Sequence, residues 1–123
     1  MLTSLLVALS LTTATPAVKT MDIKDSGKTV TISKKQPLHI ELSECGSCGY
    51  RWKTTLKPDP KVLERLPNTH NGQNCQTPCT GGSYTTVFRY DGKATGRTTL
   101  KLEYFGPGKK KSSKTFRLTV KVR

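Results

Sequence analysis

The chain has 123 residues, which leaves room for one domain with a single hydrophobic core. Its formal net charge is +13, and such a field favours anionic partners: glycosaminoglycan, nucleic acid, an acidic membrane or an acidic protein face. The charges are scattered along the sequence except at Lys109, Lys110 and Lys111, so a solvated basic surface is the plain alternative.

The first 17 residues have the layout of a secretory signal peptide. An apolar run at residues 5–11 precedes small residues, which predicts cleavage after Ala17 or Ala14; a membrane-anchoring or buried segment is the alternative. The run is too short to span a bilayer. We therefore predict a signal peptide at 1–17 and a secreted domain at 18–123, extracellular or lumenal along the secretory route, soluble and monomeric.

Period-two alternation, which is typical of half-buried strands, dominates the rest of the chain. In the first half it predicts strands over residues 29–33, 38–42 and 50–56. Residues 58–67 contain the one candidate helical turn, with Asp59 as cap and Pro60 at its first position. Residues 68–82 are rich in Asn, Gln, Gly, Thr and Pro, which predicts a long loop.

The second half predicts three more strands, at residues 84–90, 97–104 and 116–122. Six short strands with one apolar face each can bury those faces only against one another. The sequence therefore predicts an all-β fold, an immunoglobulin-like β-sandwich of antiparallel strands.

The cysteine content predicts disulfides, because the chain is small and has an export signal. A zinc site is the first alternative, since two pairs have short spacing, but neither has knuckle-like surroundings. A thioredoxin-like redox pair would need a helix after the Cys-x-x-Cys segment, and a β-prone segment follows instead. We expect no metal and no cofactor. The four residues are Cys45, Cys48, Cys75 and Cys79.

Catalytic groups are scarce. His39 is expected to project outward from a strand and His70 to be solvated in the loop, and the acidic residues form no pair, so no enzyme is predicted. Four aromatic residues could stack nucleic-acid bases, but their period-two spacing fits core packing better, so no specific nucleic-acid partner is expected. They are Tyr84, Phe88, Tyr90 and Tyr104.

Three turn-rich segments remain, at residues 45–49, 75–82 and 105–111. At one end of a sandwich, loops come from alternate connections along the chain, and these three sit at compatible places. A rigid sheet pair that presents three loops is typical of recognition. The pattern favours a binding protein over an enzyme.

The segment from Leu42 to Trp52, with Gly81, Gly82 and the β-rich tail, resembles the chagasin-type inhibitors of papain-like cysteine proteases. Those proteins have a first loop that reads Asn-Pro-Thr-Thr-Gly-aromatic-x-Trp, which this chain matches at Gly49, Tyr50 and Trp52. The tip is Cys-Gly-Ser-Cys here, and the family's Arg-Pro-Trp third loop corresponds to Gly-Pro-Gly. The likeness covers residues 22–123.

The resemblance implies an immunoglobulin-like sandwich whose three loops fill the active-site cleft of a papain-like cysteine protease. It also implies neighbouring first and second loops, hence bridges between the Cys45/Cys48 pair and the Cys75/Cys79 pair, although three connectivities are possible. A cationic module for anionic polysaccharide or microbial surfaces, using Lys109–Lys111 and Lys114, is the alternative function. The protease-binding residues implied are Gly46, Ser47, Cys48, Gly49, Thr80, Gly81, Gly82, Phe105, Gly106, Pro107 and Gly108.

Overall fold

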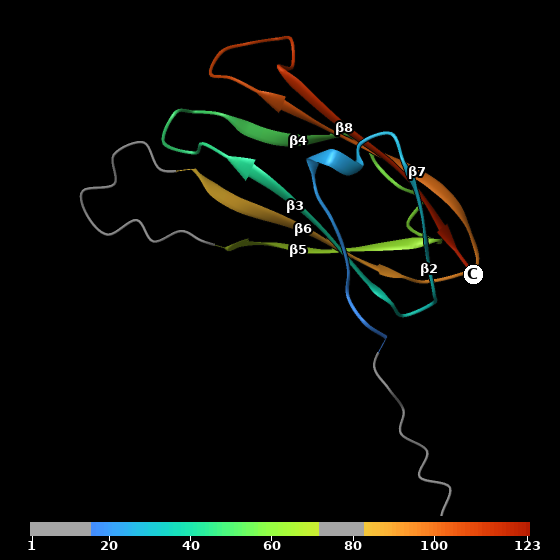
Figure 1. Ribbon diagram of the computed structural model, residues 1–123. Coiled ribbons are helices and arrows are strands. Elements are labelled where there is room, and N and C mark those ends of the chain that lie inside the picture. Colours follow the sequence, from blue (N-terminus) through green and yellow to red (C-terminus); the bar gives the residue numbers. More distant parts are fainter. Residues whose placement is uncertain (1–15, 72–82) are drawn as a thin grey trace, which may run out of the picture.

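Two four-stranded sheets pack face to face in the computed structural model, which describes residues 16–71 and 83–123 (Figure 1). The first sheet has the order β1-β3-β6-β5 and the second β2-β8-β7-β4. A 3-10 turn, η1 (Ile23–Asp25), connects the two edge strands β1 and β2. The strands are β1 (Lys19–Met21), β2 (Thr29–Ile32), β3 (Pro37–Glu44), β4 (Arg51–Leu56), β5 (Leu63–Asn71), β6 (Tyr84–Gly92), β7 (Gly96–Phe105) and β8 (Lys114–Val122).

The core lies between the sheets and follows the alternation of the sequence. In β8, Phe116, Leu118 and Val120 are fully buried, while Arg117 between them is exposed. Opposite, Leu100 of β7 pairs with Leu118, and both are at 0 % exposure. The predicted all-β sandwich is therefore confirmed, and three of the four aromatic residues considered for base stacking, Phe88, Tyr90 and Tyr104, are buried.

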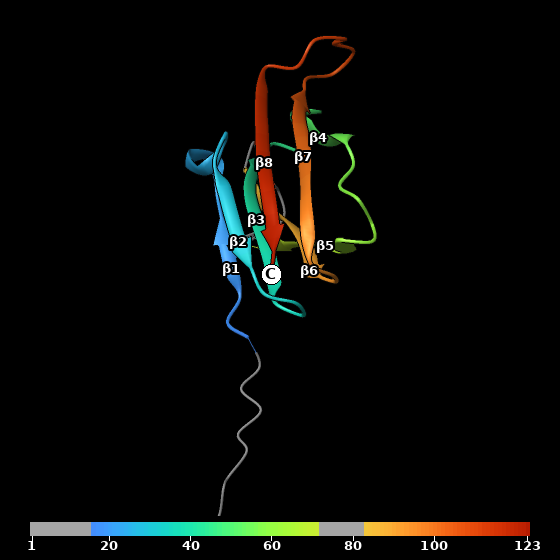
Figure 2. The ribbon, with the colours of Figure 1, turned by 90° about the vertical axis from the view of Figure 1, so that its right-hand side faces the viewer.

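The expectation of purely antiparallel sheets is wrong at two edges. β1 pairs with β3 and β2 pairs with β8, both in parallel, so each sheet is mixed. The reason is the path of the chain: β1 and β2 lie at one edge of the sandwich in opposite sheets, and η1 carries the chain across (Figure 2). The opposite edge is formed by β4 and β5.

The segment from 58 to 71 also differs from expectation. Asp59 caps a single turn, because its side-chain carboxylate accepts a hydrogen bond from the Lys61 amide at 3.0 Å. The Leu63 amide donates to the Asp59 carbonyl at 2.9 Å. From Leu63 the chain is strand β5 rather than a linker and a loop, and it pairs with β6. Pro67 is accommodated because β5 is an edge strand with a register shift between Leu66 and Thr69.

Two further expectations concern the chain's surroundings. In the part of the chain that the structure describes, no helix is long and apolar enough to cross a membrane. The predicted signal peptide falls almost entirely on residues 1–15, which lie outside the described residues, and its cleavage stays a prediction.

Candidate functional site

The first loop, residues 45–50, is a tight turn between β3 and β4. Its Cys48 amide donates to the Cys45 carbonyl at 3.2 Å, and the Tyr50 amide donates to the same oxygen at 3.1 Å. Ser47, Cys48 and Gly49 are exposed, while Cys45 and Gly46 are half-buried. The loop therefore presents its tip to solvent from a hydrogen-bonded base.

A disulfide joins Cys45 to Cys48 within this turn, with 5.2 Å between their Cα atoms. The implied bridges from these two residues to Cys75 and Cys79 are therefore wrong. The turn itself brings the two Cα atoms into the usual range for a disulfide, about 4.4–6.8 Å, so no distant partner is needed. The same bond occupies two of the four thiols that the zinc alternative required. Cys75 and Cys79 lie outside the described residues.

The third loop, residues 106–113, follows β7 at the same end of the sandwich (Figure 1). The Lys109 amide donates to the Gly106 carbonyl at 3.2 Å, and Gly108 has a φ of +65°. Proline and a positive-φ glycine at the two central positions are typical of a type II turn. At the base of the loop, the Ser113 amide donates to the Tyr104 carbonyl at 2.8 Å.

The first and third loops contact each other through Gly49 and Pro107. Gly49 has a φ of +81°, and a Cβ placed on it would lie 3.1 Å from the Pro107 Cβ. Beneath this contact, the rings of Tyr50 and Tyr104 stack with 5.1 Å between their centroids. The structure thus brings together the predicted residues Gly46, Ser47, Cys48 and Gly49 with Gly106, Pro107 and Gly108, and the half-buried Phe105 ends β7 beside them.

Tyr104 links β7 to the first loop. Its hydroxyl oxygen accepts a hydrogen bond from the Cys45 amide at 2.8 Å, and its ring packs on Trp52 at 4.8 Å. Trp52 in turn donates from its indole nitrogen to the Ser43 carbonyl at 2.9 Å. The family-like Trp52 is therefore a buried support of the first loop, not a contact residue at its tip.

A polar network lies under the other side of the first loop. The Thr86 hydroxyl donates to the buried Glu44 carboxylate at 2.7 Å and lies 3.3 Å from His70 Nδ1. Because the Thr86 proton goes to Glu44, His70 Nδ1 is the donor in the second bond. Arg51 is 3.7 Å from Glu44 and donates to the Tyr50 carbonyl at 2.9 Å. Thr86 is 2 % exposed, so the group holds the loop and offers no accessible nucleophile.

The predicted residues of the second loop, Thr80, Gly81 and Gly82, lie outside the described residues. The strands β5 and β6 flank this segment. Tyr84, at the start of β6, pairs with Glu44, and Asn71, at the end of β5, pairs with Thr85. A Cβ on Gly46 would lie 2.5 Å from the Tyr84 hydroxyl, so β6 begins directly against the first loop.

Positive charge surrounds this end of the sandwich. Lys109, Lys110 and Lys111 are exposed on the third loop. Lys53 lies 5.4 Å from the Phe105 ring centroid and Lys114 lies 5.5 Å from that of Tyr104. Hydrogen bonds from Thr55 and Ser112 and the charge of Lys101 lower the pKa of Glu103, which keeps this carboxylate ionised beside the lysines. An acidic partner surface would be attracted here.

Nothing in this arrangement of described residues assembles a reaction centre. His39 lies between the inward residues Leu38 and Ile40 and so faces outward, as predicted. His70 is in β5 rather than in a loop, and it is exposed while contacting Thr86. Among residues 16–71 and 83–123, no three His, Cys, Asp or Glu side chains gather as a metal site.

The supporting residues were not found from the sequence. Glu44, Thr86 and Arg51 are separated by up to 42 positions, and only the β3–β6 register brings Glu44 and Thr86 together. The Tyr104 hydroxyl bond spans 59 positions. The one available signal was Glu44 at an inward position of a strand, since a buried carboxylate needs hydrogen-bond donors.

Comparison with known proteins identifies the fold and the family. A sequence model of the family described as "Chagasin family peptidase inhibitor I42" matches residues 31–120. The cysteine protease inhibitor EhICP2 from Entamoeba histolytica has a similar structure, with a TM-score of 0.73, 21% identity and coverage of 87% of this chain and 96% of that one. PbICP-C, solved in complex with falcipain-2, gives a TM-score of 0.58 at 17% identity, covering 89% and 93%.

One curated relative matches only in part. The chain is 29% identical over 68 residues to mouse (Mus musculus) endosome/lysosome-associated apoptosis and autophagy regulator family member 2. The match covers 55% of this chain, and the chain spans 7% of the length of that relative.

Proposed function

Because the chain belongs to the chagasin family of peptidase inhibitors, we propose that it inhibits papain-like cysteine proteases by filling their active-site cleft. The family is one of inhibitors, so the protein is not an enzyme. The observation that carries the proposal is the joint surface of the first and third loops, where Gly49 meets Pro107. A partner of PbICP-C is falcipain-2, which supports a protease as the partner here as well.

The proposed mechanism needs no chemical step by the inhibitor. The exposed tip, Ser47 to Gly49, enters the cleft and brings backbone close to the protease's catalytic groups, since small residues allow close approach. The third loop flanks it on one side, and Thr80, Gly81 and Gly82 would contribute from the other. No covalent bond to the chain forms or breaks in this mechanism, so the complex is reversible and is held by non-covalent contacts alone.

Rigidity supports tight binding. The tip is held by the Cys45–Cys48 disulfide, the Tyr104 hydroxyl and the Arg51 guanidinium. Loops fixed before binding lose little conformational freedom on binding. An interface of standard size with such loops reaches a Kd of roughly 1 nM to 1 μM.

Competition tests where the inhibitor binds. Papain is first blocked with a small covalent reagent on its catalytic cysteine, and binding of the chain is then measured by surface plasmon resonance. This reagent occupies part of the cleft. If the first loop enters the cleft, the block therefore weakens binding of the chain by at least about 10-fold, or 1.4 kcal/mol. Equal affinity for free and blocked papain would place the interface elsewhere.

The cellular location belongs to the same proposal. We infer export with cleavage after Ala17, supported by strand β1 beginning at Lys19 and by the Cys45–Cys48 disulfide, which needs an oxidising compartment. Amino-terminal sequencing of protein collected from the medium of expressing cells tests this. A first residue of Val18 is expected, and a retained Met1 would contradict it.

A second candidate is binding of anionic polysaccharide, favoured by the exposed Lys109, Lys110 and Lys111 at the loop end. Chromatography on a heparin column distinguishes specific polysaccharide binding from the general attraction of a basic surface. Elution that needs more than about 0.5 M salt supports it, and elution near physiological ionic strength counts against it.

A further inference from the structure

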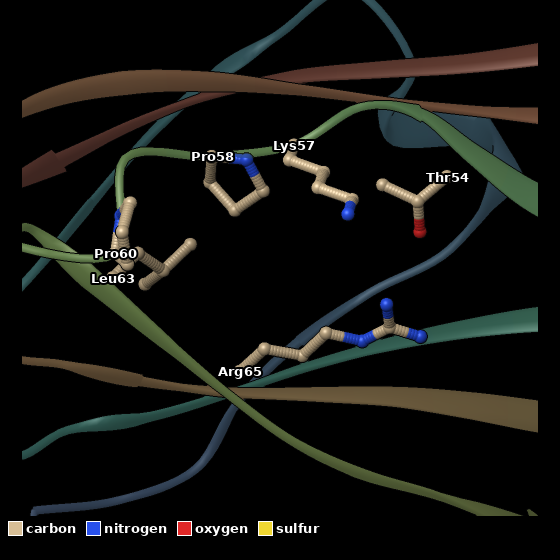
Figure 3. A pocket seen from close by; sticks show the side chains of 6 residues that line it. All are labelled: Thr54, Lys57, Pro58, Pro60, Leu63 and Arg65. Carbon is tan, nitrogen blue, oxygen red and sulfur yellow. The ribbon is translucent and has the colours of Figure 1, made fainter.

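A pocket of about 250 Å³ opens between the two sheets at the edge formed by β4 and β5 (Figure 3). None of the loop residues described above lines it, so it is separate from the proposed protease site. Its walls come from the end of β4, the capped turn and the start of β5. The lining residues are Thr54, Lys57, Pro58, Pro60, Leu63 and Arg65.

The strand register explains why a threonine and an arginine face this gap. Thr54 pairs with Leu102, and Arg65 pairs with Tyr90. Both partners are at 0 % exposure on the inner faces of their sheets. Residues directly opposite in an antiparallel pair share a face. Thr54 and Arg65 therefore project from the inner faces of the two edge strands, toward the space between the sheets.

The pocket has a polar end and an apolar end. Figure 3 shows the Lys57 ammonium, the Thr54 hydroxyl and the Arg65 guanidinium converging on one side, with Pro58, Pro60 and Leu63 on the other. Leu63 is 1 % exposed and Pro58 is buried, so the apolar end is continuous with the core. Among the described residues, neither Lys57 nor Arg65 forms a salt bridge.

The hydroxyl groups beside Arg65 lack partners. In the described part of the chain, two buried side-chain oxygens make no hydrogen bond, those of Thr54 and Tyr90. Thr54 lines the pocket, and Tyr90 is the cross-strand neighbour of Arg65. Buried polar atoms without partners are rare because they lose hydration without compensation. An inward charge that blocks edge pairing would explain Arg65, and Lys57 is exposed to solvent, but neither explains the unpaired Thr54 hydroxyl.

We propose that this pocket binds a small amphipathic carboxylate. The Arg65 fork can hold a carboxylate through two parallel N–H bonds, and Lys57 adds a second positive charge. The Thr54 hydroxyl, which is covered in this structure, donates its proton to a carboxylate oxygen after the groups that cover it move aside. The apolar body of the ligand packs on Pro58, Pro60 and Leu63. The volume suits a chain of about six carbons or a single ring.

Nuclear magnetic resonance with hexanoate as the probe tests the site, with 1-hexanol as the uncharged match. Hexanoate is expected to shift the backbone amide signals of residues 54–65 in a saturable way, with a Kd on the order of 1 mM, and hexanol to bind at least about 10-fold more weakly. No saturable shift up to about 20 mM hexanoate, or equal binding of hexanol, would overturn the proposal.

Matched variants locate the contact. Arg65→Gln is expected to weaken hexanoate binding by about 10-fold or more, and Thr54→Val by about 3-fold or more, since each removes a bond to the carboxylate. Arg117→Gln removes the same charge from an exposed position on β8 and should leave the Kd within about 2-fold. Equal weakening by Arg117→Gln would show only general charge attraction. The inhibition of papain is not involved, so either proposal can fail alone.

Discussion

The Tyr104 hydroxyl oxygen accepts a hydrogen bond from the Cys45 amide at 2.8 Å, which ties the strand before the third loop to the first residue of the first loop. The Tyr104 ring also stacks on Tyr50 and packs on Trp52. One residue of the scaffold therefore sets the position of the loop that is proposed to enter the protease.

Replacing Tyr104 by Phe removes that bond but keeps the ring. The partly buried Cys45 amide loses its acceptor, so we expect the free energy of unfolding to fall by about 1–2 kcal/mol and the affinity for papain to fall about 10-fold. Urea denaturation and inhibition titration measure the two effects. Tyr84→Phe is the control, because the Tyr84 hydroxyl forms no hydrogen bond with the described residues, 16–71 and 83–123. Equal effects of both variants would contradict the role given to Tyr104.

Gly49→Ala tests the contact between the two loops. Alanine at a φ of +81° costs about 1–2 kcal/mol, and its Cβ would push on Pro107. Gly27→Ala carries the same backbone cost at a φ of +87°, lies outside the three loops and has no atom within 4 Å of its Cβ. We expect the two variants to be similarly destabilised and only Gly49→Ala to lose at least about 10-fold in affinity. If Gly27→Ala loses as much, displacement of Pro107 is not the cause.

The Glu44 carboxylate depends on Thr86. Thr86→Val keeps the shape but removes the donor at 2.7 Å, and loss of a hydrogen bond to a buried charge should lower the free energy of unfolding by about 1.5–3 kcal/mol. Thr99→Val breaks a pair of neutral hydroxyls in the other sheet and should cost less than about 1 kcal/mol. Thermal and urea unfolding compare the two. A larger loss for Thr99→Val would refute the account of the network.

The disulfide is expected to matter more for binding than for folding. It closes a loop of only four residues, for which the chain-entropy estimate is about 2 kcal/mol of stability. The double variant Cys45→Ser and Cys48→Ser should therefore remain folded at 25 °C, while a more mobile tip weakens inhibition about 10-fold. Circular dichroism and inhibition titration check this. A variant that is unfolded, or that inhibits as well as the parent chain, would show that the bond has another role.

The strands with clear alternation could be predicted because their pairing is dictated by burial. Leu100, Leu102 and Tyr104, for example, alternate with half-buried residues in β7 as expected. Strand β5 could not be predicted, because its sequence is polar and contains Pro67. It lies at a sheet edge, where a strand needs backbone hydrogen bonds to only one neighbouring strand. The parallel pairing of β1 depends on a three-residue strand that has no sequence pattern of its own.

The loops could be located from their glycines and cysteines, but the disulfide and the hydrogen bonds that fix them could not be predicted. The Cys45–Cys48 pairing follows from a local turn, whereas the prediction relied on loops lying side by side. Tyr104 was expected in the core because of its spacing, and its ring is there. Its hydroxyl bond to Cys45 depends on the relative height of two strands in different sheets, which no local pattern encodes.

The central claim is that the chain blocks papain-like proteases through its loop end. Titration of active-site-calibrated papain and of a cathepsin with the recombinant chain, followed with a fluorogenic peptide, measures it most directly. We expect reversible inhibition, competitive with substrate, with a Kd between roughly 1 nM and 1 μM and with the inhibitor recovered uncleaved. Full protease activity in the presence of excess chain at micromolar concentration would contradict it.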